Sequence, residues 1–315
     1  MPIPSGLKAI DLMMNIPDGD PTAWYEFIKP LLLDEESRKQ FKMPAQYMFK
    51  DIPQIGEQKD YVGYAIGEMD KWGIQQAMLG ISGPNSTNLE ACRDHPDRFF
   101  PSYGANPNNG MEEVRKIRQL HKEHGLKAVT GFPSGLCPQV PLNDKKYYPI
   151  YATCVDLDIP ICVCVGVPGP RIPMEPQKVE HIDEVCWFFP ELKFVMRHGA
   201  DPWVDLAVKL MLKYPNLYYS TSAFAPKHYP KSIIHYANTR GTDKIMYAGY
   251  FPMGLSLERI FTDMQNVPFK DHVWPKFLAC STWTHRSFWA PLPDSTQSLT
   301  LEHRALDSCE CTGYP

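Results

Sequence analysis

The stretch Lys193-Phe-Val-Met-Arg-His-Gly-Ala-Asp-Pro-Trp203 predicts a buried strand that delivers a histidine to its C-terminal end. Its apolar residues lead directly into Arg197-His198-Gly199, and a Pro-Trp pair then begins a new helix. In a barrel of alternating strands and helices, the catalytic residues lie at the C-terminal ends of the strands. His198 is therefore the first candidate for a functional residue.

The order of a short apolar run and a longer amphipathic run recurs along most of the chain. Strands are predicted at residues 7–14, 76–82, 99–105, 127–132, 159–165, 193–198, 217–222 and 244–248. Helices are predicted at residues 60–72, 85–95, 111–124, 146–157, 177–188, 203–213, 227–239 and 255–265. Apolar strands that alternate with helices favour a parallel sheet covered by helices. Eight such units predict an α/β fold, a (β/α)8 TIM barrel, and no Gly-x-Gly-x-x-Gly follows a strand to support a dinucleotide-binding fold.

We predict one barrel domain over residues 1–278, with residues 15–59 forming an insertion after the first strand. An insertion at that position caps the mouth of the site, contacts a second subunit, or is a structural excursion on the surface. The sequence leaves these alternatives open. Residues 279–315 are rich in Ser, Thr, Pro and Cys without a helical period, which predicts a loosely ordered tail.

The composition is that of a globular metabolic protein. The chain has 315 residues, 43% of them hydrophobic, and a net charge of −4. This balance does not indicate binding to nucleic acid or to an anionic membrane. We find no signal peptide and no apolar run of the roughly 18 residues that a membrane helix needs. We therefore expect a cytoplasmic protein whose nine cysteines are reduced.

Motifs at the predicted strands follow the order of one known family. They are Lys8–Asp11, Phe99–Pro107, Leu126–Val129, Ile159–Ile161, Pro190–Gly199, Asn216–Ser222 and Asp243–Pro252. Together they resemble the amidohydrolase-related branch of the amidohydrolase superfamily, which includes aminocarboxymuconate-semialdehyde decarboxylase and aromatic-acid decarboxylases. The resemblance covers about residues 7–278. It implies a small-molecule enzyme, a hydrolase or a non-oxidative carboxy-lyase acting on a carboxylate or cyclic substrate, often as a homodimer.

The resemblance also implies where a divalent metal such as zinc or manganese would bind. The family closes its first strand with a His-x-His pair, its fifth and sixth strands with histidines, and its eighth with an aspartate. At these positions this chain carries Met13, Asn15, Cys164, His198 and Tyr250. A thioether and an amide are weak ligands for these metals. We expect no metal and no other cofactor, although a softer site for Cu(I) or zinc at Met13, Cys164 and His198 stays open.

A histidine with an ordinary pKa of about 6.5 transfers protons without a metal, so we predict His198 as a catalytic acid or base. Tyr250 is the second predicted catalytic residue. Arg171, after the fifth strand, is predicted to bind a substrate carboxylate through two hydrogen bonds. Arg197 is next to His198, but adjacent strand residues point to opposite faces. The other predicted substrate-binding residues are Asn15, Cys164, Met13 and Asp201.

Each assignment has a structural alternative. Arg171 is also explained as a solvated loop residue, Tyr250 as a filler of the volume left by the metal, and His198 as a structural histidine. Several substituted ligand positions also fit a barrel that has lost catalysis and acts as a ligand-binding or subunit-interaction protein. Ser220 and Ser222 lack the strained turn of a nucleophile elbow, which argues against a serine hydrolase.

Overall fold

Eight parallel strands form one sheet in the order of the chain. The computed structural model describes residues 3–4, 6–18, 21–39, 43–82 and 87–279. Each strand pairs with the next one along the chain, from β1 with β2 to β7 with β8. The strands are β1 (Ala9–Met14), β2 (Ile74–Gly80), β3 (Phe99–Gly104), β4 (Ala128–Gly131), β5 (Ile161–Cys164), β6 (Phe194–Arg197), β7 (Leu217–Ser220) and β8 (Ile245–Met246).

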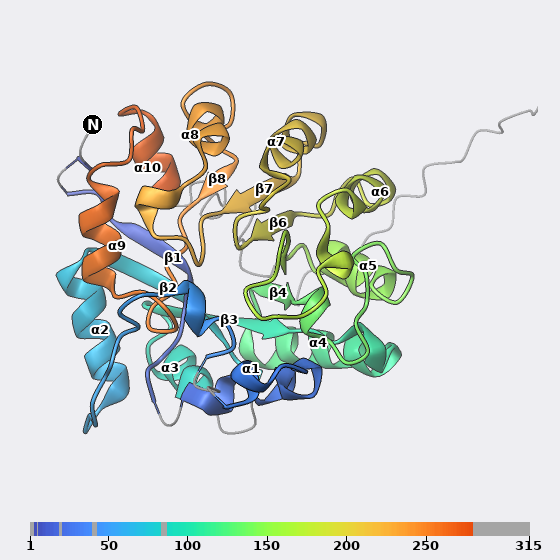
Figure 1. Cartoon of the computed structure of the whole chain (residues 1–315), viewed down its shortest axis with the longest axis horizontal. Helices are drawn as coiled ribbons and strands as arrows, with labels where there is room; N and C mark the ends of the chain where they lie inside the picture. Colours follow the sequence, from blue (N-terminus) through green and yellow to red (C-terminus); the bar gives the residue numbers. More distant parts are fainter. Residues whose placement is uncertain (1–2, 5, 19–20, 40–42, 83–86, 280–315) are drawn as a thin grey trace, which may run out of the picture.

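Helices alternate with these strands and surround them, which confirms the predicted TIM barrel (Figure 1). Each lies inside or close to a predicted helical range. They are α2 (Tyr61–Lys71), α3 (Thr87–Asp94), α4 (Met111–His124), α5 (Tyr148–Asp156), α6 (His181–Phe188), α7 (Val204–Lys213), α8 (Lys231–Ala237) and α9 (Leu257–Met264). A further helix that the sequence pattern did not predict, α10 (Val273–Leu278), buries Trp274 and Phe277 and packs against β8 and β1.

Local sequence explains where the helices begin and end. On α4, Glu112 and Glu113 occupy the first turn, where acidic side chains interact favourably with the positive end of the helix dipole and stabilise the helix. The helix ends at Gly125, whose φ of 62° is a left-handed conformation that glycine adopts without strain. On α9, the Ser256 side chain accepts a hydrogen bond from the Arg259 N–H at 3.2 Å.

The barrel closes where the end of β1 meets the segment after β8. The Leu12 N–H donates to the Tyr247 carbonyl at 3.4 Å, and the Asn15 N–H donates to the Phe251 carbonyl at 3.0 Å. The carboxylate of Asp11 adds to this seam. Its Oδ1 accepts the Gly249 N–H at 2.8 Å and the Met13 N–H at 2.9 Å.

The insertion between β1 and α2 contains η1 (Pro21–Leu31), α1 (Glu35–Lys39) and η2 (Gln46–Met48). It packs on loops that follow the C-terminal ends of the strands. The Phe27 ring lies 6.3 Å from that of Phe132 after β4, and the Tyr47 hydroxyl donates to the Gly169 carbonyl after β5 at 2.7 Å. Of the open alternatives, these contacts favour a cap over the mouth of the barrel.

The predicted tail, residues 279–315, lies outside the described residues except for Ala279. Within the described part of the chain, no helix combines the length and the apolar character needed to cross a membrane.

Replacing Asp11 with Asn tests the buried carboxyl at the seam. Burial raises the pKa of Asp11 to about 6. A carboxyl with a raised pKa in the folded state favours folding while it is protonated, so its contribution is lost as the pH rises from about 4 through 6. Asn cannot ionise but retains an acceptor for both N–H groups. We expect Asp11→Asn to gain stability relative to wild type between pH 4 and pH 7, by roughly 2 kcal/mol.

Urea unfolding of both proteins at the two pH values measures this gain. Other titrating groups, His198 among them, act equally in both proteins and cancel in the difference. A difference that is the same at pH 4 and pH 7 would contradict the raised pKa.

Candidate active site

Five side chains from four strand ends meet inside the mouth of the barrel: Met13, Cys164, Arg197, His198 and Tyr250. We refer to these five residues as the mouth cluster. One terminal nitrogen of the Arg197 guanidinium contacts the Met13 thioether. The His198 ring lies 5.6 Å from the Tyr250 ring, edge to face. The charge of Arg197 acts on Cys164, His198 and Tyr250 alike. The structure therefore brings together four of the predicted site residues and adds Arg197.

The backbone explains why two adjacent residues of β6 reach one site. The strand ends at Arg197, and His198 follows with a φ of 64°. Gly199 and Ala200 continue with φ values of 96° and 59°. This left-handed run ends the alternation that holds within a strand. The expectation that Arg197 and His198 point to opposite faces is therefore wrong. Strained backbone of this kind clusters at functional sites in proteins.

Ser222 fixes the His198 ring. The Ser222 hydroxyl oxygen accepts the His198 backbone N–H at 3.2 Å and lies 3.1 Å from Nδ1 of the ring. A hydroxyl that accepts from the backbone has its own hydrogen available for Nδ1. This arrangement favours the tautomer with the hydrogen on Nε2. Burial, followed by the charge of Arg197, lowers the pKa of His198 to about 3. The ring is therefore neutral at physiological pH.

Arg197 is a buried cation, only 8% exposed. Its Nε has no hydrogen-bond partner, and no carboxylate of the described residues lies within 4.0 Å of its guanidinium. A thioether is a weak acceptor, so the contact with Met13 does little to compensate. Burying an unpaired charge in a protein is costly.

Like His198, the other titratable neighbours of Arg197 are uncharged at neutral pH. Burial raises the pKa of Cys164 to about 11 and that of Cys162 to about 12. Burial, with a smaller contribution from Cys164, raises the pKa of Tyr250 to about 12. The mouth cluster thus carries one net positive charge.

The insertion covers this cluster. The Phe49 ring stacks on the Tyr250 ring at 5.6 Å. Burial, and then the facing Tyr250 hydroxyl, raise the pKa of Tyr25. Met13, His198 and Tyr250 nevertheless remain partly accessible. At the end of β2, Gly80 is exposed, and a Cβ added there would meet nothing within 4 Å. Solvent therefore still reaches the side chains of Met13, His198 and Tyr250 under the insertion.

Asn15 lies at the same end of the barrel, and its side chain is already engaged. Its Oδ1 accepts a hydrogen bond from the amide of the buried Asn88. The same amide nitrogen donates to the Gly80 carbonyl at 2.7 Å. Asn88 thereby links the ends of β1 and β2 and orients Asn15.

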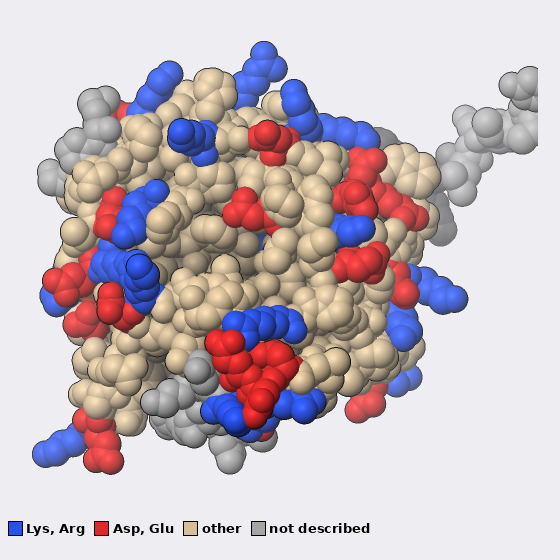
Figure 2. Space-filling model, viewed as in Figure 1, with Lys and Arg blue, Asp and Glu red and all other residues tan. Residues whose placement is uncertain are grey.

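Arg171 and Asp201 were both predicted to bind substrate, but they lie outside the mouth cluster. The Arg171 guanidinium forms ion pairs with Asp34 at 3.0 Å and Glu36 at 2.8 Å and lies 4.8 Å from the Tyr47 ring centroid. Charged side chains of both signs gather over α1 in Figure 2. The Asp201 side chain is exposed beyond the end of β6. Arg171 is thus committed to holding the insertion, so the geometry does not support its predicted role on a substrate carboxylate.

Sequence reasoning missed three contributors to the site. Arg197 was set aside because of strand alternation, and Ser222 was considered only as a nucleophile. Phe49 belonged to an insertion whose path the sequence did not show. The signal that was available for Arg197 is its place directly before the strand-end histidine.

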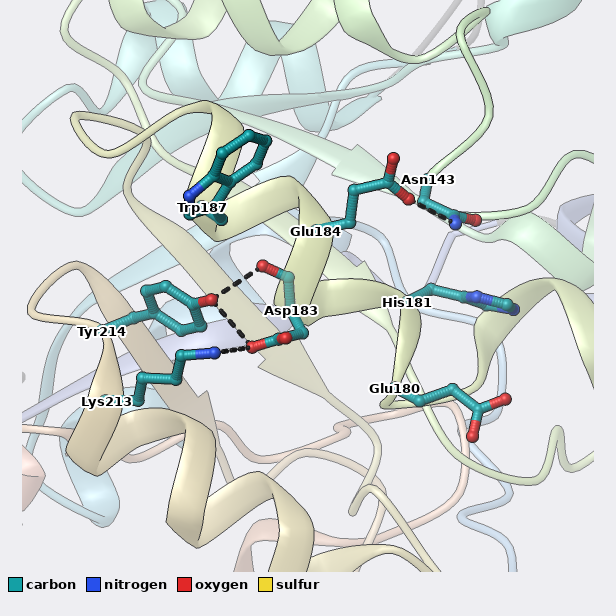
Figure 3. A pocket seen from close by; sticks show the side chains of 8 residues that line it. All are labelled: Asn143, Glu180, His181, Asp183, Glu184, Trp187, Lys213 and Tyr214. Carbon is teal, nitrogen blue, oxygen red and sulfur yellow. Dashed lines mark hydrogen bonds and ion pairs between the residues drawn. The ribbon is translucent and has the colours of Figure 1, made fainter. Parts of the chain in front are cut away.

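A groove of about 350 Å³ lies elsewhere, on the outer helices α6 and α7 (Figure 3). Its polar groups are paired with one another: Asp183 accepts from the Lys213 ammonium at 2.6 Å and from the Tyr214 hydroxyl at 2.7 Å. The lining residues are Asn143, Glu180, His181, Asp183, Glu184, Trp187, Lys213 and Tyr214. None belongs to the mouth cluster.

Comparison with known proteins places the chain in a family. A family model for amidohydrolases matches residues 20–256, so the chain belongs to the amidohydrolase family. No curated protein is significantly similar to it in sequence.

Three solved structures with similar folds illustrate the neighbourhood. An uncharacterised TIM-barrel protein from Bordetella bronchiseptica is 23% identical, with a TM-score of 0.64 over 86% of this chain and 95% of the other. A 5-carboxyvanillate decarboxylase from Novosphingobium aromaticivorans, complexed with manganese and 4-hydroxy-3-methoxy-5-nitrobenzoic acid, is 16% identical, with a TM-score of 0.60 over 90% and 96%. A 2,6-dihydroxybenzoate decarboxylase from Rhizobium is 15% identical, with a TM-score of 0.59 over 90% and 99%. The family match supports an enzyme, and the three neighbours show the same barrel fold.

The protonation state of His198 is directly measurable. We expect its ring nitrogens to show the neutral pattern from pH 8 down to about pH 5, because burial and Arg197 hold its pKa near 3. Nitrogen-15 NMR of histidine-labelled protein checks this, with His198→Gln to assign the signal. In Arg197→Met the pKa of His198 is expected to rise, because one of the two causes is removed. A wild-type His198 that titrates between pH 6 and 7 would contradict the geometry.

Proposed function

We propose that this chain is a small-molecule enzyme of the decarboxylase-like branch of its family, a hydrolase or carboxy-lyase that works without a metal. The observation that carries the proposal is the placement of His198 in an accessible, covered site at the C-terminal end of the barrel. This is the part of the fold at which TIM-barrel enzymes carry out their chemistry.

The donor set supports the metal-free form of the proposal. Among the described residues, no group of three or more His, Cys, Asp or Glu side chains is arranged to hold a metal ion. Met13 offers a neutral thioether and Asn15 an amide oxygen, both weak ligands for these metals, and the guanidinium of Arg197 near Cys164 would repel a divalent cation. The residues present therefore do not fit zinc or manganese.

His198 supplies proton transfer in this proposal. With Nδ1 held by Ser222, the Nε2 side of the ring is the side left to face a bound molecule, to which it donates a hydrogen bond in the favoured tautomer. For Nε2 to accept a proton, the Ser222 hydroxyl must turn to accept a hydrogen bond from Nδ1, which then carries the ring hydrogen. The neutral ring is a weak base because burial and the charge of Arg197, which has no counterion among the described residues, lower its pKa. An anion bound beside Arg197 would cancel part of that positive field and raise the pKa of His198 towards its ordinary value. The base is thus activated by the arrival of an anionic substrate.

Tyr250 has the role of a hydrogen-bond donor. Its raised pKa keeps the phenol protonated at neutral pH. Its ring lies between those of His198 and Phe49, so the backbone and two neighbours fix its position. Asn15, Met13 and Cys164 complete the walls that a substrate would contact.

The second candidate is a barrel that binds a ligand without catalysis. The low pKa of His198 favours it, because a ring that holds its proton so weakly is a poor general base. A screen of aromatic and unsaturated carboxylic acids and of cyclic amides separates the two. Release of carbon dioxide or of a hydrolysis product supports the enzyme, and binding without turnover supports the second candidate.

His198→Gln is the decisive variant once a substrate is found. We expect kcat to fall by a factor of about 10² to 10⁴, the usual contribution of a general acid or base. His124→Gln, at an exposed position on α4, is the matched control and should leave kcat unchanged. Equal turnover in wild type and His198→Gln would contradict the assigned role.

Metal content is a separate prediction. We expect protein purified without chelator to contain less than stoichiometric zinc or manganese by mass spectrometry. Added metal or EDTA should leave turnover unchanged. A stoichiometric metal that is lost in His198→Gln would overturn the metal-free form of the proposal.

A further inference from the structure

We infer that Arg197 is the anion-binding residue of the mouth cluster, and that it binds the carboxylate of a small planar monocarboxylate. This role rests on the proposed function and deepens it, because it assigns the residue that selects a substrate by its negative charge. The role thus moves from Arg171, where the sequence pattern placed it, to a buried position next to His198.

The first argument is the state of the guanidinium. Arg197 is more than nine-tenths buried, its Nε has no partner, and one terminal nitrogen contacts only a thioether. A guanidinium has five N–H donors in a planar fork that matches a carboxylate. Arg171, which is exposed, has two carboxylates within 3.0 Å. The buried arginine is thus the one whose donors are left for a ligand.

The second argument is charge balance. The groups that feel Arg197 from neighbouring strand ends are Cys162 and Cys164 on β5, His198 on β6 and Tyr250 after β8. All four are neutral at pH 7, for the reasons given above. The nearest buried acid along β1, Asp11, is turned to the seam and bound by two backbone N–H groups. A monoanion would bring the net charge of the mouth cluster to zero.

The third argument is the shape and polarity of the walls. The rings of Phe49, Tyr250 and Tyr25 cover the cluster, and Gly80 leaves open space at the neighbouring strand end. Flat aromatic walls favour a planar body, while the forked donor favours a planar carboxylate. A second negative charge would have no partner among the described groups that surround Arg197. This combination selects monocarboxylates over neutral molecules and over dicarboxylates.

Binding of benzoate tests the inference without requiring turnover. We expect calorimetry to detect benzoate binding to the wild type, with benzamide, its neutral analogue, bound at least tenfold more weakly. Arg197→Met, which keeps an unbranched side chain without the charge, should raise the Kd for benzoate by a factor of about 10 to 100. Arg197→Lys, which keeps the charge but not the fork, should lie between the two. Arg115→Met, at an exposed position on α4, is the matched control and should bind like the wild type.

Thermal unfolding without ligand shows that the variants are folded. Arg197→Met should be at least as stable as the wild type, since it removes an unpaired buried charge. Should it fail to fold, the comparison of Arg197→Lys with the wild type retains the test. A Kd for benzoate within threefold of the wild-type value in Arg197→Met, or absence of benzoate binding to the wild type at millimolar concentration, would overturn the inference.

The two proposals fail separately. Arg197-dependent benzoate binding without turnover in the substrate screen supports the inference and removes the proposed catalysis. Turnover of a carboxylate with the same KM in wild type and Arg197→Met supports the catalysis and overturns the role of Arg197.

Discussion

The electrostatics of this barrel depend on one buried guanidinium. Arg197 stands at the end of β6 without a counterion among the described residues, and the side chains around it adjust to its charge. His198 is held neutral beside it, and Cys164 and Tyr250 keep their protons in spite of it because they are buried. In the proposed function, this fixed side chain supplies the positive charge of the site.

The fold was largely predictable because it rests on local periodicity. Eight apolar runs that alternate with amphipathic ones have few alternatives to a barrel, and each predicted strand and helix that lies in the described residues has its counterpart. The ends of the elements were less predictable, since hydrogen bonding rather than hydrophobicity decides where a strand ends. The helix α10 was missed because its six residues are too few to show a helical period.

The site was only partly predictable, and the reasons are physical. Met13, Cys164, His198 and Tyr250 meet because strand ends meet in a barrel, which the topology implies. Arg197 was misjudged because a left-handed run from His198 to Ala200 changes the direction of the chain, and no side-chain pattern reports a φ of 64° at a non-glycine residue. The prediction for Arg171 lacks support from the geometry for a different reason. Its partners Asp34 and Glu36 are 137 and 135 residues away in the chain, and sequence spacing does not reveal such ion pairs.

The stack of Phe49 on Tyr250 joins a segment near the start of the chain to the last strand end of the barrel. The strands of the barrel form one continuous hydrogen-bonded sheet, whereas the described part of the insertion contains two 3-10 helices and one five-residue α-helix. Such segments open locally at much lower free energy than the core around which they fold. A ligand at the mouth cluster has to pass this covering segment, so we expect substitutions at its packing contacts to change the residence time of the ligand more than the chemistry.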